Sequence, residues 1–270
     1  MIISIVTPVL NGGDDLRACI ESVKAQTPRG ALVEHLIIDG GSTDGSAELA
    51  AALGARVLRE PTVGLTGRMN IGYRAAMGEL IGFLGADDML LPGAVEAVVA
   101  AYRRSGRRWV IGGLRWITPD GHSLGEFRAP PQWMPVAAHV ALDWNVISPL
   151  ATYISRDFFA QLGGYDEHYD VSADFELFAR ALQQEPFERV AQPLACWRRH
   201  RRNHSVLHTD AAAREADAIR QSLGLSDDPG QLLRRCAMKL WFNLRNPDWC
   251  GHKFIERARL QLETARQARA

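Results

Sequence analysis

Two adjacent carboxylates, Asp87 and Asp88, follow the apolar run of residues 80–84 after a Gly-Ala spacer. Carboxylate oxygens are preferred ligands of hard divalent cations, and a cation held there can bridge the protein to a diphosphate group. An acidic cap on a helix that begins near Pro92 is the structural alternative, since proline suits the first helical turn. Capping does not require two aspartates, so the pair predicts a site for Mn²⁺ or Mg²⁺.

A third carboxylate, Asp39, follows the apolar residues 36–38 and precedes Gly40 and Gly41. An aspartate at this place can accept a hydrogen bond from the imide N–H of a nucleobase, and the two glycines let a ligand approach the backbone closely. Asp39 and the Ser-Thr-Asp sequence at 42–44 are also typical turn and N-cap residues. A structural role therefore stays open beside the binding role.

A fourth carboxylate, Asp174, lies where a helix is expected to begin, two residues after the plausible N-cap Ser172. The helix N-terminus favours the ionised carboxylate, which leaves Asp174 ready to accept a proton but weakens it as a base. Asp174 is thus a candidate general base, and a helix cap is the alternative.

Regular elements must position these carboxylates. Residues 2–6, 36–38 and 80–84 are β-branched or apolar runs typical of buried strands. Residues 15–26 and 43–53 predict helices between them, the first with one apolar face and the second after an N-cap sequence. Alternating strands and helices predict a parallel, doubly wound sheet, which binds ligands beyond the carboxyl ends of its strands.

The regularity weakens after Val110, and residues 129–149 are rich in proline and tryptophan. We interpret this part as an inserted region that determines specificity. Regular structure is predicted again with a strand over 151–155, a helix over 174–184 and an extended segment over 189–197.

Helices are expected beyond Thr209. From Gln231 to the end, nine basic residues stand against three acidic ones and are interleaved with apolar side chains that include Trp241 and Trp249. This mixture predicts peripheral contact with an anionic membrane surface. A packed helical hairpin with a solvated basic face is the alternative.

Composition excludes several classes of protein. Lysine plus arginine equals aspartate plus glutamate at 31 each, so the chain lacks the positive field typical of nucleic-acid binders. The four cysteines form no CxxC pair, which indicates free thiols in a reducing compartment. The N-terminus lacks the basic region of a signal peptide, and no apolar run approaches the ~18–20 residues that cross a bilayer. We expect a cytoplasmic protein, with the C-terminal tail as a candidate contact to the inner membrane surface.

The chain resembles glycosyltransferase family 2 over about residues 1–205, in four motifs that occur in the family's order: SIVTPVLN, IIDGGSTDGS, GLTGRMNIGYRAAMGELIGFLGADD and GGYDEHYDVSADFELF. The resemblance implies the GT-A fold, which is an α/β, Rossmann-like fold with a mostly parallel sheet flanked by helices. It also implies a nucleotide-diphosphate sugar donor, usually UDP-linked, and a metal-assisted transfer to a hydroxyl with inversion.

The resemblance leads to an expected division of the chain. A GT-A domain is expected over 1–208, with a donor-binding half at about 1–115 and an acceptor-binding half at about 116–208. A helical extension is expected over 209–270. The expected acceptor is a glycan or a lipid-linked sugar in cell-envelope or polysaccharide synthesis.

Residue by residue, the resemblance implies roles for the four carboxylates. Asp39 matches the aspartate that reads the base, and Asp87 matches the acid beside the ribose. Asp88 matches the metal ligand, and Asp174 matches the catalytic base of a Glu-Asp motif in which Ala173 replaces the glutamate.

Further positions match the donor side of the family's site. Pro8 and Asn11 fit the first motif, and Asn70 matches an asparagine near the donor. Arg68 is a candidate diphosphate partner through its forked N–H donors. His200, in a late arginine-histidine segment, is a candidate for the metal shell, with a solvated basic loop as the alternative.

On the acceptor side, Trp133 and Trp144 are candidates to stack a sugar ring, with a core or interface role as the alternative. Two functions are alternatives to a glycosyltransferase. A sugar-1-phosphate nucleotidyltransferase needs a basic, glycine-rich loop after the first strand, whereas here no basic residue occurs before Arg17. A non-catalytic nucleotide-sugar-binding protein is disfavoured by the intact carboxylates.

Overall fold

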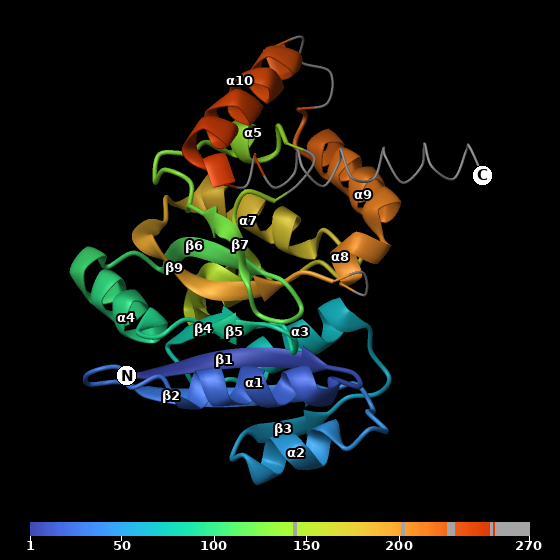
Figure 1. Cartoon of the computed structure of the whole chain (residues 1–270). Helices are drawn as coiled ribbons and strands as arrows, with labels where there is room; N and C mark the ends of the chain where they lie inside the picture. The colour runs from blue at the N-terminus through green and yellow to red at the C-terminus, as the bar shows by residue number, and fades with distance from the viewer. Residues whose placement is uncertain (143–144, 201–202, 226–229, 249–250, 252–270) are drawn as a thin grey trace.

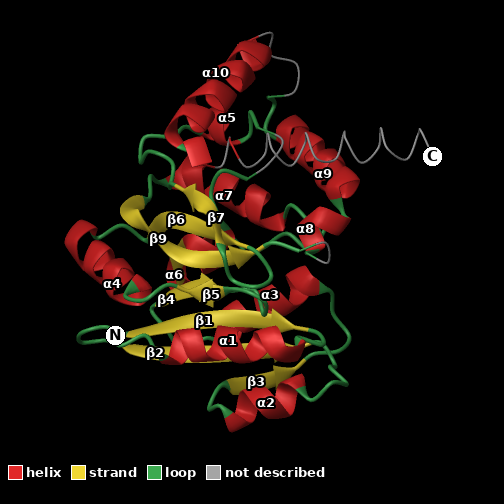
Figure 2. Ribbon diagram, viewed as in Figure 1, coloured by secondary structure: helices red, strands yellow, loops and turns green. Residues whose placement is uncertain are grey.

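The computed structural model describes residues 1–142, 145–200, 203–225, 230–248 and 251. These residues form an α/β fold in which one nine-stranded sheet is flanked by helices (Figures 1 and 2). The strand order is β3-β2-β1-β4-β8-β6-β9-β5, and β7 pairs with β6 outside this path. The N-terminal part of the chain builds one half of the sheet, and the later strands build the other (Figure 1).

The first half of the sheet confirms the predicted alternation. It begins with β1 (Ile2–Val9), α1 (Gly13–Lys24), β2 (Leu32–Asp39), α2 (Ser46–Ala52) and β3 (Arg56–Arg59). The three strands pair in parallel, and α1 packs against α2 in front of them as viewed in Figure 2. Both β1 and β2 extend further than the apolar runs that predicted them, because the parallel pairing continues past the end of the first run and starts before the second.

The chain then returns to the centre of the sheet. The elements are α3 (Leu65–Ala75), β4 (Leu80–Phe83), β5 (Met89–Leu90) and α4 (Ala94–Ser105). Strand β4 pairs in parallel with β1, and α3 packs against β1 and β2. The carboxyl ends of β1, β2 and β4 therefore face the same edge of the sheet.

The second half of the sheet is mixed. It contains β6 (Trp109–Ile117), β7 (Ser123–Phe127), β8 (Thr152–Ser155) and β9 (Glu188–Arg198). Of the eight pairings between described strands, the four formed by β4–β8, β5–β9, β6–β7 and β6–β8 are antiparallel. The expectation of a mostly parallel sheet thus holds only for the first half, because the segment interpreted as an irregular insertion begins with the β6–β7 hairpin.

Short helices connect these strands, and longer ones follow them. The connecting elements are α5 (Val136–His139), the 3₁₀ turn η1 (Pro149–Ala151), α6 (Arg156–Gln161) and α7 (Ala173–Gln184).

After β9 come α8 (His204–Leu207), α9 (Thr209–Ser222) and α10 (Gly230–Arg245), which confirms the prediction of helices for the described residues beyond 209. No helix in the part of the chain that the structure describes is long and apolar enough to cross a membrane.

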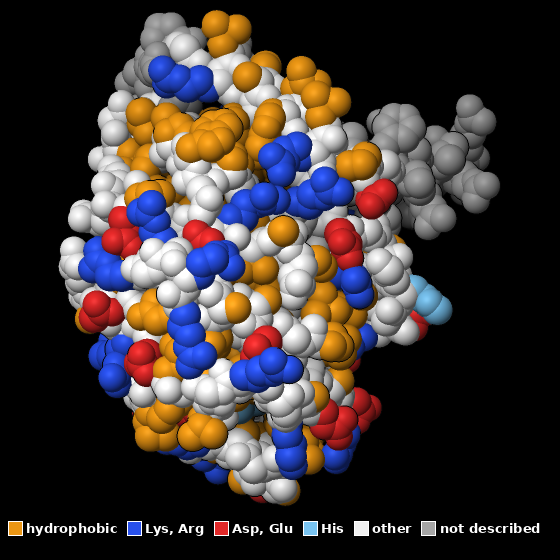
Figure 3. Space-filling model, turned by 90° about the vertical axis from the view of Figure 1, so that its left-hand side faces the viewer, with side chains coloured by type: hydrophobic (Ala, Val, Ile, Leu, Met, Phe, Trp, Pro, Cys, Tyr) orange, Lys and Arg blue, Asp and Glu red, His pale blue; other side chains and the backbone are white. Residues whose placement is uncertain are grey.

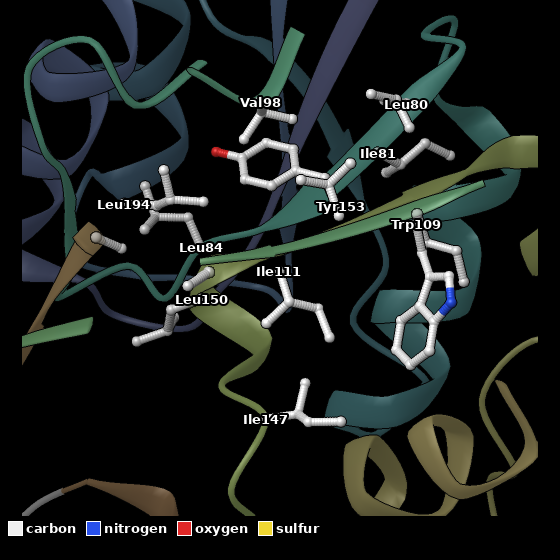
Figure 4. Close-up of a cluster of buried hydrophobic side chains, with 14 of the residues drawn as sticks. Leu80, Ile81, Leu84, Val98, Trp109, Ile111, Ile147, Leu150, Tyr153 and Leu194 are labelled. Carbon is white, nitrogen blue, oxygen red and sulfur yellow. The ribbon is translucent and has the colours of Figure 1, made fainter. Parts of the chain in front are cut away.

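The main core joins the two halves of the sheet. Figure 4 shows side chains from β4, β6 and β8 packed together, including Leu80, Trp109 and Tyr153. Trp109 is fully buried, and its indole N–H donates to the carbonyl oxygen of Glu185 at 3.2 Å. Its ring lies edge-on to Phe187, with centroids 5.3 Å apart. This packing fixes the strands whose ends carry the predicted site residues.

Candidate functional site

A cavity of about 1160 Å³ opens at the carboxyl ends of β1 and β4 and extends to the N-terminus of α7. Its wall contains side chains from both halves of the sheet. Seven of the nine residues predicted for the site line it: Pro8, Asn11, Arg68, Asp87, Asp88, Asp174 and His200. Residues from distant parts of the sequence are thus brought to one cavity, and Asp39 and Asn70 are not among its lining residues.

Asn11 joins the loops that follow β1 and β2. Its backbone has a positive φ of 53°, a conformation that asparagine tolerates better than most residues. Its N–H donates to Ser42 Oγ at 2.9 Å, and its Oδ1 accepts the N–H of Thr43 at 2.9 Å. The next N–H, of Gly12, donates to Ser46 Oγ at 3.0 Å. These bonds fix the rim of the cavity beside Pro8.

Asp39 is fully buried at the end of β2. Its carboxylate accepts the N–H of Ser42 at 3.1 Å and Nε of Arg59 at 3.1 Å. Burial alone would raise the pKa of Asp39, but hydrogen bonds from Ser42 and Arg59 outweigh it and hold the pKa below its usual value. Asp39 therefore has the structural role in the turn that the sequence left open, with Arg59 as an additional partner. Its role in reading the base stays a prediction.

Arg68, on α3, presents a guanidinium group to the cavity. Its Nη1 donates to Val63 O at 2.8 Å, while its Nε is buried without a hydrogen-bond partner. Burial lowers the pKa of Arg68, although the negative charges of Asp39 and Asp170 act to raise it. No carboxylate of the described residues forms a salt bridge with Arg68, so its cation is available for an anionic ligand.

The neighbouring Gly40 leaves room for this guanidinium group. A Cβ atom at this position would come within 2.8 Å of Arg68 Nη1. Any larger residue would push the guanidinium away from the place it now occupies.

Asn70 lies two residues further along α3, with 4% of its surface exposed. Its Nδ2 donates to Tyr165 O and to Glu167 Oε1, both at 2.9 Å, while its Oδ1 accepts the N–H of Tyr165 at 2.9 Å. The whole amide is used to hold the glycine-rich loop before α7. The structure therefore places Asn70 behind the cavity as a support for this loop rather than at the surface a donor would contact.

Asp88 and Asp87 lie in the loop after β4, on the wall of the cavity. Asp88 is 3% exposed, and its Oδ1 accepts the N–H of Arg198 at 2.9 Å. Burial, followed by repulsion from Asp87, raises the pKa of Asp88 well above its usual value. Asp87 Oδ2 lies 2.7 Å from Nε2 of His200 and accepts Nδ2 of Asn203 at 3.2 Å.

Arg198, at the end of β9, holds in place the loop of Asp87 and Asp88, which we call the acidic loop. Its Nε donates to the carbonyl oxygen of Asp87 at 3.0 Å and lies 3.3 Å from Asp15 Oδ1. Only 7% of Arg198 is exposed, so it is a buried clamp at a strand end and not part of a solvated basic loop. The sequence predicted either a place in the metal shell or a solvated basic loop for this segment, and neither the clamp nor Asp15 was expected. Two later arginines of the segment, Arg201 and Arg202, lie outside the described residues.

The acidic loop can be tested as a cation site. Within the described ranges, no group of three or more His, Cys, Asp or Glu residues is arranged to hold a metal ion, and His200 contacts Asp87. However, burial of the Asp88 carboxylate beside that of Asp87 is unfavourable unless a positive charge compensates them. The pair therefore fits a cation that takes its remaining ligands from a diphosphate and water, as Mg²⁺ commonly does.

Asp174 lies in the first turn of α7 and lines the cavity. Its Oδ2 accepts Nδ2 of Asn145 at 3.0 Å, and its Oδ1 accepts the N–H of Phe175 at 2.8 Å. Burial raises the pKa of Asp174 to about 6, although both hydrogen bonds oppose this shift. The helix start was expected to weaken the base, but burial dominates. A carboxylate with this pKa is well suited to accept a proton near neutral pH.

An aromatic wall completes the cavity. Trp116 and Trp197 both line it, with ring centroids 5.0 Å apart at an interplanar angle of 74°. Trp133 is 75% exposed and is not among the lining residues, while Trp144 lies outside the described residues. The sequence analysis missed Trp116 and Trp197 because nothing local distinguishes a cavity tryptophan from a core one.

A match to a protein-family model assigns the chain to a family. The model of glycosyl transferase family 2 matches residues 4–157, which include the acidic loop and the loops after β1 and β2. The chain belongs to glycosyl transferase family 2. It is therefore a glycosyltransferase, as the four motifs predicted.

Two relatives illustrate the similarity within family 2. An uncharacterized glycosyltransferase of Mycobacterium tuberculosis is 32% identical over 190 residues, which cover 66% of this chain and 68% of the relative. The uncharacterized glycosyltransferase YibD of Escherichia coli is 34% identical over 102 residues, covering 36% of this chain and 29% of the relative.

A solved structure shares the fold of this family 2 member. The S. aureus protein TarS, residues 1–349, matches with a TM-score of 0.61 at 14% identity. The match covers 81% of this chain and 65% of that one, so this chain spans about two thirds of the TarS fragment. A complex of the same fragment with UDP-GlcNAc matches with a TM-score of 0.61 over 88% of this chain and 79% of that one, at 13% identity. The similarity confirms the GT-A type fold.

Proposed function

We propose that this glycosyltransferase moves a sugar from a UDP-sugar to an acceptor hydroxyl with inversion, assisted by Mn²⁺ or Mg²⁺. One observation carries the proposal: a single cavity brings together an acidic pair, a guanidinium that forms no salt bridge with a described carboxylate, and an aspartate with a pKa of about 6. The complexes of TarS with UDP and with UDP-GlcNAc support a donor of this class.

The donor side of the proposal depends on charge. Asp88 and Asp87 are the residues that would hold the cation, which when bound neutralises charge developing on the departing diphosphate. Arg68 would donate its free N–H groups to the same diphosphate. Arg198 and Asn203 keep the acidic pair in place through the bonds described above. His200 would act by orienting Asp87 or by joining the metal shell.

The acceptor side depends on Asp174. Asn145 donates to one carboxylate oxygen and so orients the other towards the proton of an attacking hydroxyl. Attack on the face of the anomeric carbon opposite the leaving group gives inversion without a covalent intermediate. Trp197, backed by Trp116, offers an apolar ring surface for an acceptor sugar and excludes water. The acceptor we propose is a glycan or lipid-linked sugar.

The donor is tested by thermal unfolding with a panel of UDP-GlcNAc, UDP-glucose, UDP-galactose and GDP-mannose, each with Mn²⁺ or with chelator. A ligand that binds only the native state at ~100 times its dissociation constant stabilises it by about 2.7 kcal/mol. We expect a rise in unfolding temperature for at least one UDP-sugar, only with the cation. A rise for GDP-mannose alone would contradict the UDP assignment.

Adding UTP with a sugar 1-phosphate to the panel, and measuring which product is released, separates the rival functions. A sugar-1-phosphate nucleotidyltransferase would be stabilised by UTP together with a sugar phosphate and would release pyrophosphate. A non-catalytic binding protein would bind a nucleotide sugar without releasing UDP. The proposed enzyme releases UDP.

We also propose that α10 contacts an anionic membrane surface. The helix carries Arg234, Arg235, Lys239 and Arg245 and no acidic residue, and Leu233, Leu240 and Leu244 are 62–75% exposed. These leucines recur at a spacing that places them on one side of the helix, opposite the buried Phe242. Figure 3 shows hydrophobic side chains gathered beside Lys and Arg near the upper end of the molecule, where α10 lies in Figure 1. Such a surface matches an anionic bilayer.

The membrane proposal predicts a loss of binding from two substitutions. Leu240→Glu together with Leu244→Glu should abolish co-sedimentation with vesicles of anionic phospholipid, because charge opposes insertion of the apolar stripe. Leu32→Glu is the matched control, since Leu32 is 71% exposed on β2. Equal binding of all three proteins would mean that α10 has only a structural role.

A further inference from the structure

Glu215, on α9, contacts the backbone that leads into the helix of Asp174. Its Oε1 accepts the N–H of Asp170 at 3.1 Å. Its Oε2 accepts the N–H of Val171 at 3.1 Å and that of Ser172 at 2.7 Å. One carboxylate thus satisfies three successive backbone donors immediately before α7, which begins at Ala173.

These donors have no alternative partner within their own helix. The first N–H groups of an α-helix and of the turn before it lack intrahelical acceptors, and a side chain must usually supply them. Ser172 occupies the N-cap position, but its hydroxyl donates to Ala212 O at 3.3 Å instead of accepting from the helix. The acceptor for the start of α7 therefore comes from α9, 43 residues further along the chain.

The same helix also holds the segment that leads to Asn145, the partner of Asp174. Arg220 is 8% exposed and donates to Val140 O at 3.1 Å and to Leu142 O at 3.3 Å. Ala216 and Ile219 of α9 pack in a small core with Val140 of that segment and Phe175 of α7. Helix α9 thus contacts both the start of α7, which carries Asp174, and the segment that leads to Asn145, its hydrogen-bond partner.

We propose that Glu215 is a positioning residue for Asp174 and that the catalytic unit includes α9, up to Ser222. This inference rests on the role of general base proposed for Asp174. Bonds from an ionised acceptor are stronger than neutral ones, so Glu215 sets where α7 begins and where its first-turn carboxylate lies. The GT-A domain was expected to end at residue 208. This proposal extends it to Ser222.

Glu215→Gln tests the proposal with little change in shape. The amide has one acceptor oxygen in place of two, and its NH₂ group faces backbone donors, so at least one of the three bonds is lost. We expect the rate of UDP release from the best sugar of the panel to fall by about 10- to 100-fold, since a displacement near 1 Å can cost a hundredfold. The affinity for UDP should stay unchanged, because the residues proposed to bind it lie on other loops.

A second measurement does not need a donor. Amide hydrogen exchange at residues 170–172 should become faster in Glu215→Gln, while exchange in α3 stays as in the wild type. Asp210→Asn is the matched control, because it removes an exposed carboxylate from the first turn of the same helix. This control should change neither the exchange at residues 170–172 nor the rate of UDP release.

A double-mutant cycle with Asp174→Asn separates an effect that acts through Asp174 from one that does not. If Glu215 acts through Asp174, Glu215→Gln should slow the wild type but not the Asp174→Asn protein. Equal losses in both backgrounds, or unchanged exchange and release in Glu215→Gln, would overturn the inference. Failure of the proposed function looks different: Asp174→Asn would itself keep the wild-type rate, and the positioning role would then fall with it.

Discussion

Replacing Asp174 with asparagine is expected to slow sugar transfer by about 10²–10⁴, the usual contribution of a general base. Asparagine keeps the shape of the side chain, and its oxygen can still accept one of the two bonds now made by Asn145 and the N–H of Phe175. It cannot accept the proton of the acceptor hydroxyl. Donor binding should persist, since Asp174 lies on α7, whereas the residues proposed to hold the diphosphate lie on α3 and in the loop after β4.

The experiment measures UDP affinity and transfer rate on the same preparation. Asp120→Asn, which removes an exposed carboxylate from the β6–β7 turn, is the control for the chemical change. If Asp174 were only a helix cap, asparagine would cap nearly as well and transfer would persist. Near-normal transfer would reject the base and turn attention to Asp166, Asp170 and Glu176.

The pH dependence of the wild type follows from the same carboxyl group. The base acts when ionised, and burial raises the pKa of Asp174 to about 6. Transfer should therefore be lost as the pH falls through about 6, by about tenfold per unit well below it. This acid limb should be absent from the residual activity of Asp174→Asn. A limb near the ordinary pKa of an exposed aspartate would show that burial does not control the base.

Replacing Asp88 with asparagine is expected to weaken UDP binding in Mn²⁺ by about 2 kcal/mol or more, on the order of thirtyfold. A carboxylate and a diphosphate repel each other unless a cation lies between them. In excess chelator the wild type should therefore bind UDP no more tightly than the variant. Titration calorimetry measures all four combinations, with Asp120→Asn as the control.

The stability of the ligand-free Asp88→Asn protein distinguishes a lost metal ligand from a damaged fold. Burial and the neighbouring charge of Asp87 raise the pKa of Asp88, which means that the ionised form is unfavourable in the free protein. A neutral amide removes this penalty and can still accept the N–H of Arg198. We expect an unfolding temperature no lower than that of the wild type. Unchanged UDP affinity of the wild type in Mn²⁺ and in chelator would remove the metal from this site.

Local sequence was sufficient for the parts of the fold whose cause is local. The apolar runs at the cores of β1, β2 and β4, and the helices α1 and α2, follow from periodicity and N-cap residues, whereas α3 was not predicted. Since parallel strands end at one edge of the sheet, Asp87, Asp88 and Asn11 could be assigned to one cavity before any coordinates were known. The order of the four motifs was sufficient for the family.

The second half of the sheet could not be predicted in the same way. Antiparallel pairing of β6 with β7 and β8 depends on which strands meet, and the proline- and tryptophan-rich composition of this region suggested irregular structure. Strand β6 is buried through most of its length by partners that lie before and after it in the chain. Such long-range packing leaves no periodic signal that a short window can detect.

The sequence by itself determined which chemical groups are present and which strand ends carry them. The tertiary structure decided which of those groups are used in contacts within the protein and which can contact a ligand. It used the amide of Asn70 to hold a loop, paired Asp39 with Arg59, and buried Arg198 beneath the acidic pair. It also decided the strength of the base, because burial raises the pKa of Asp174 against the local effect of the helix start. Burial and hydrogen bonding depend on residues far apart in the chain, whereas residue type and strand position do not.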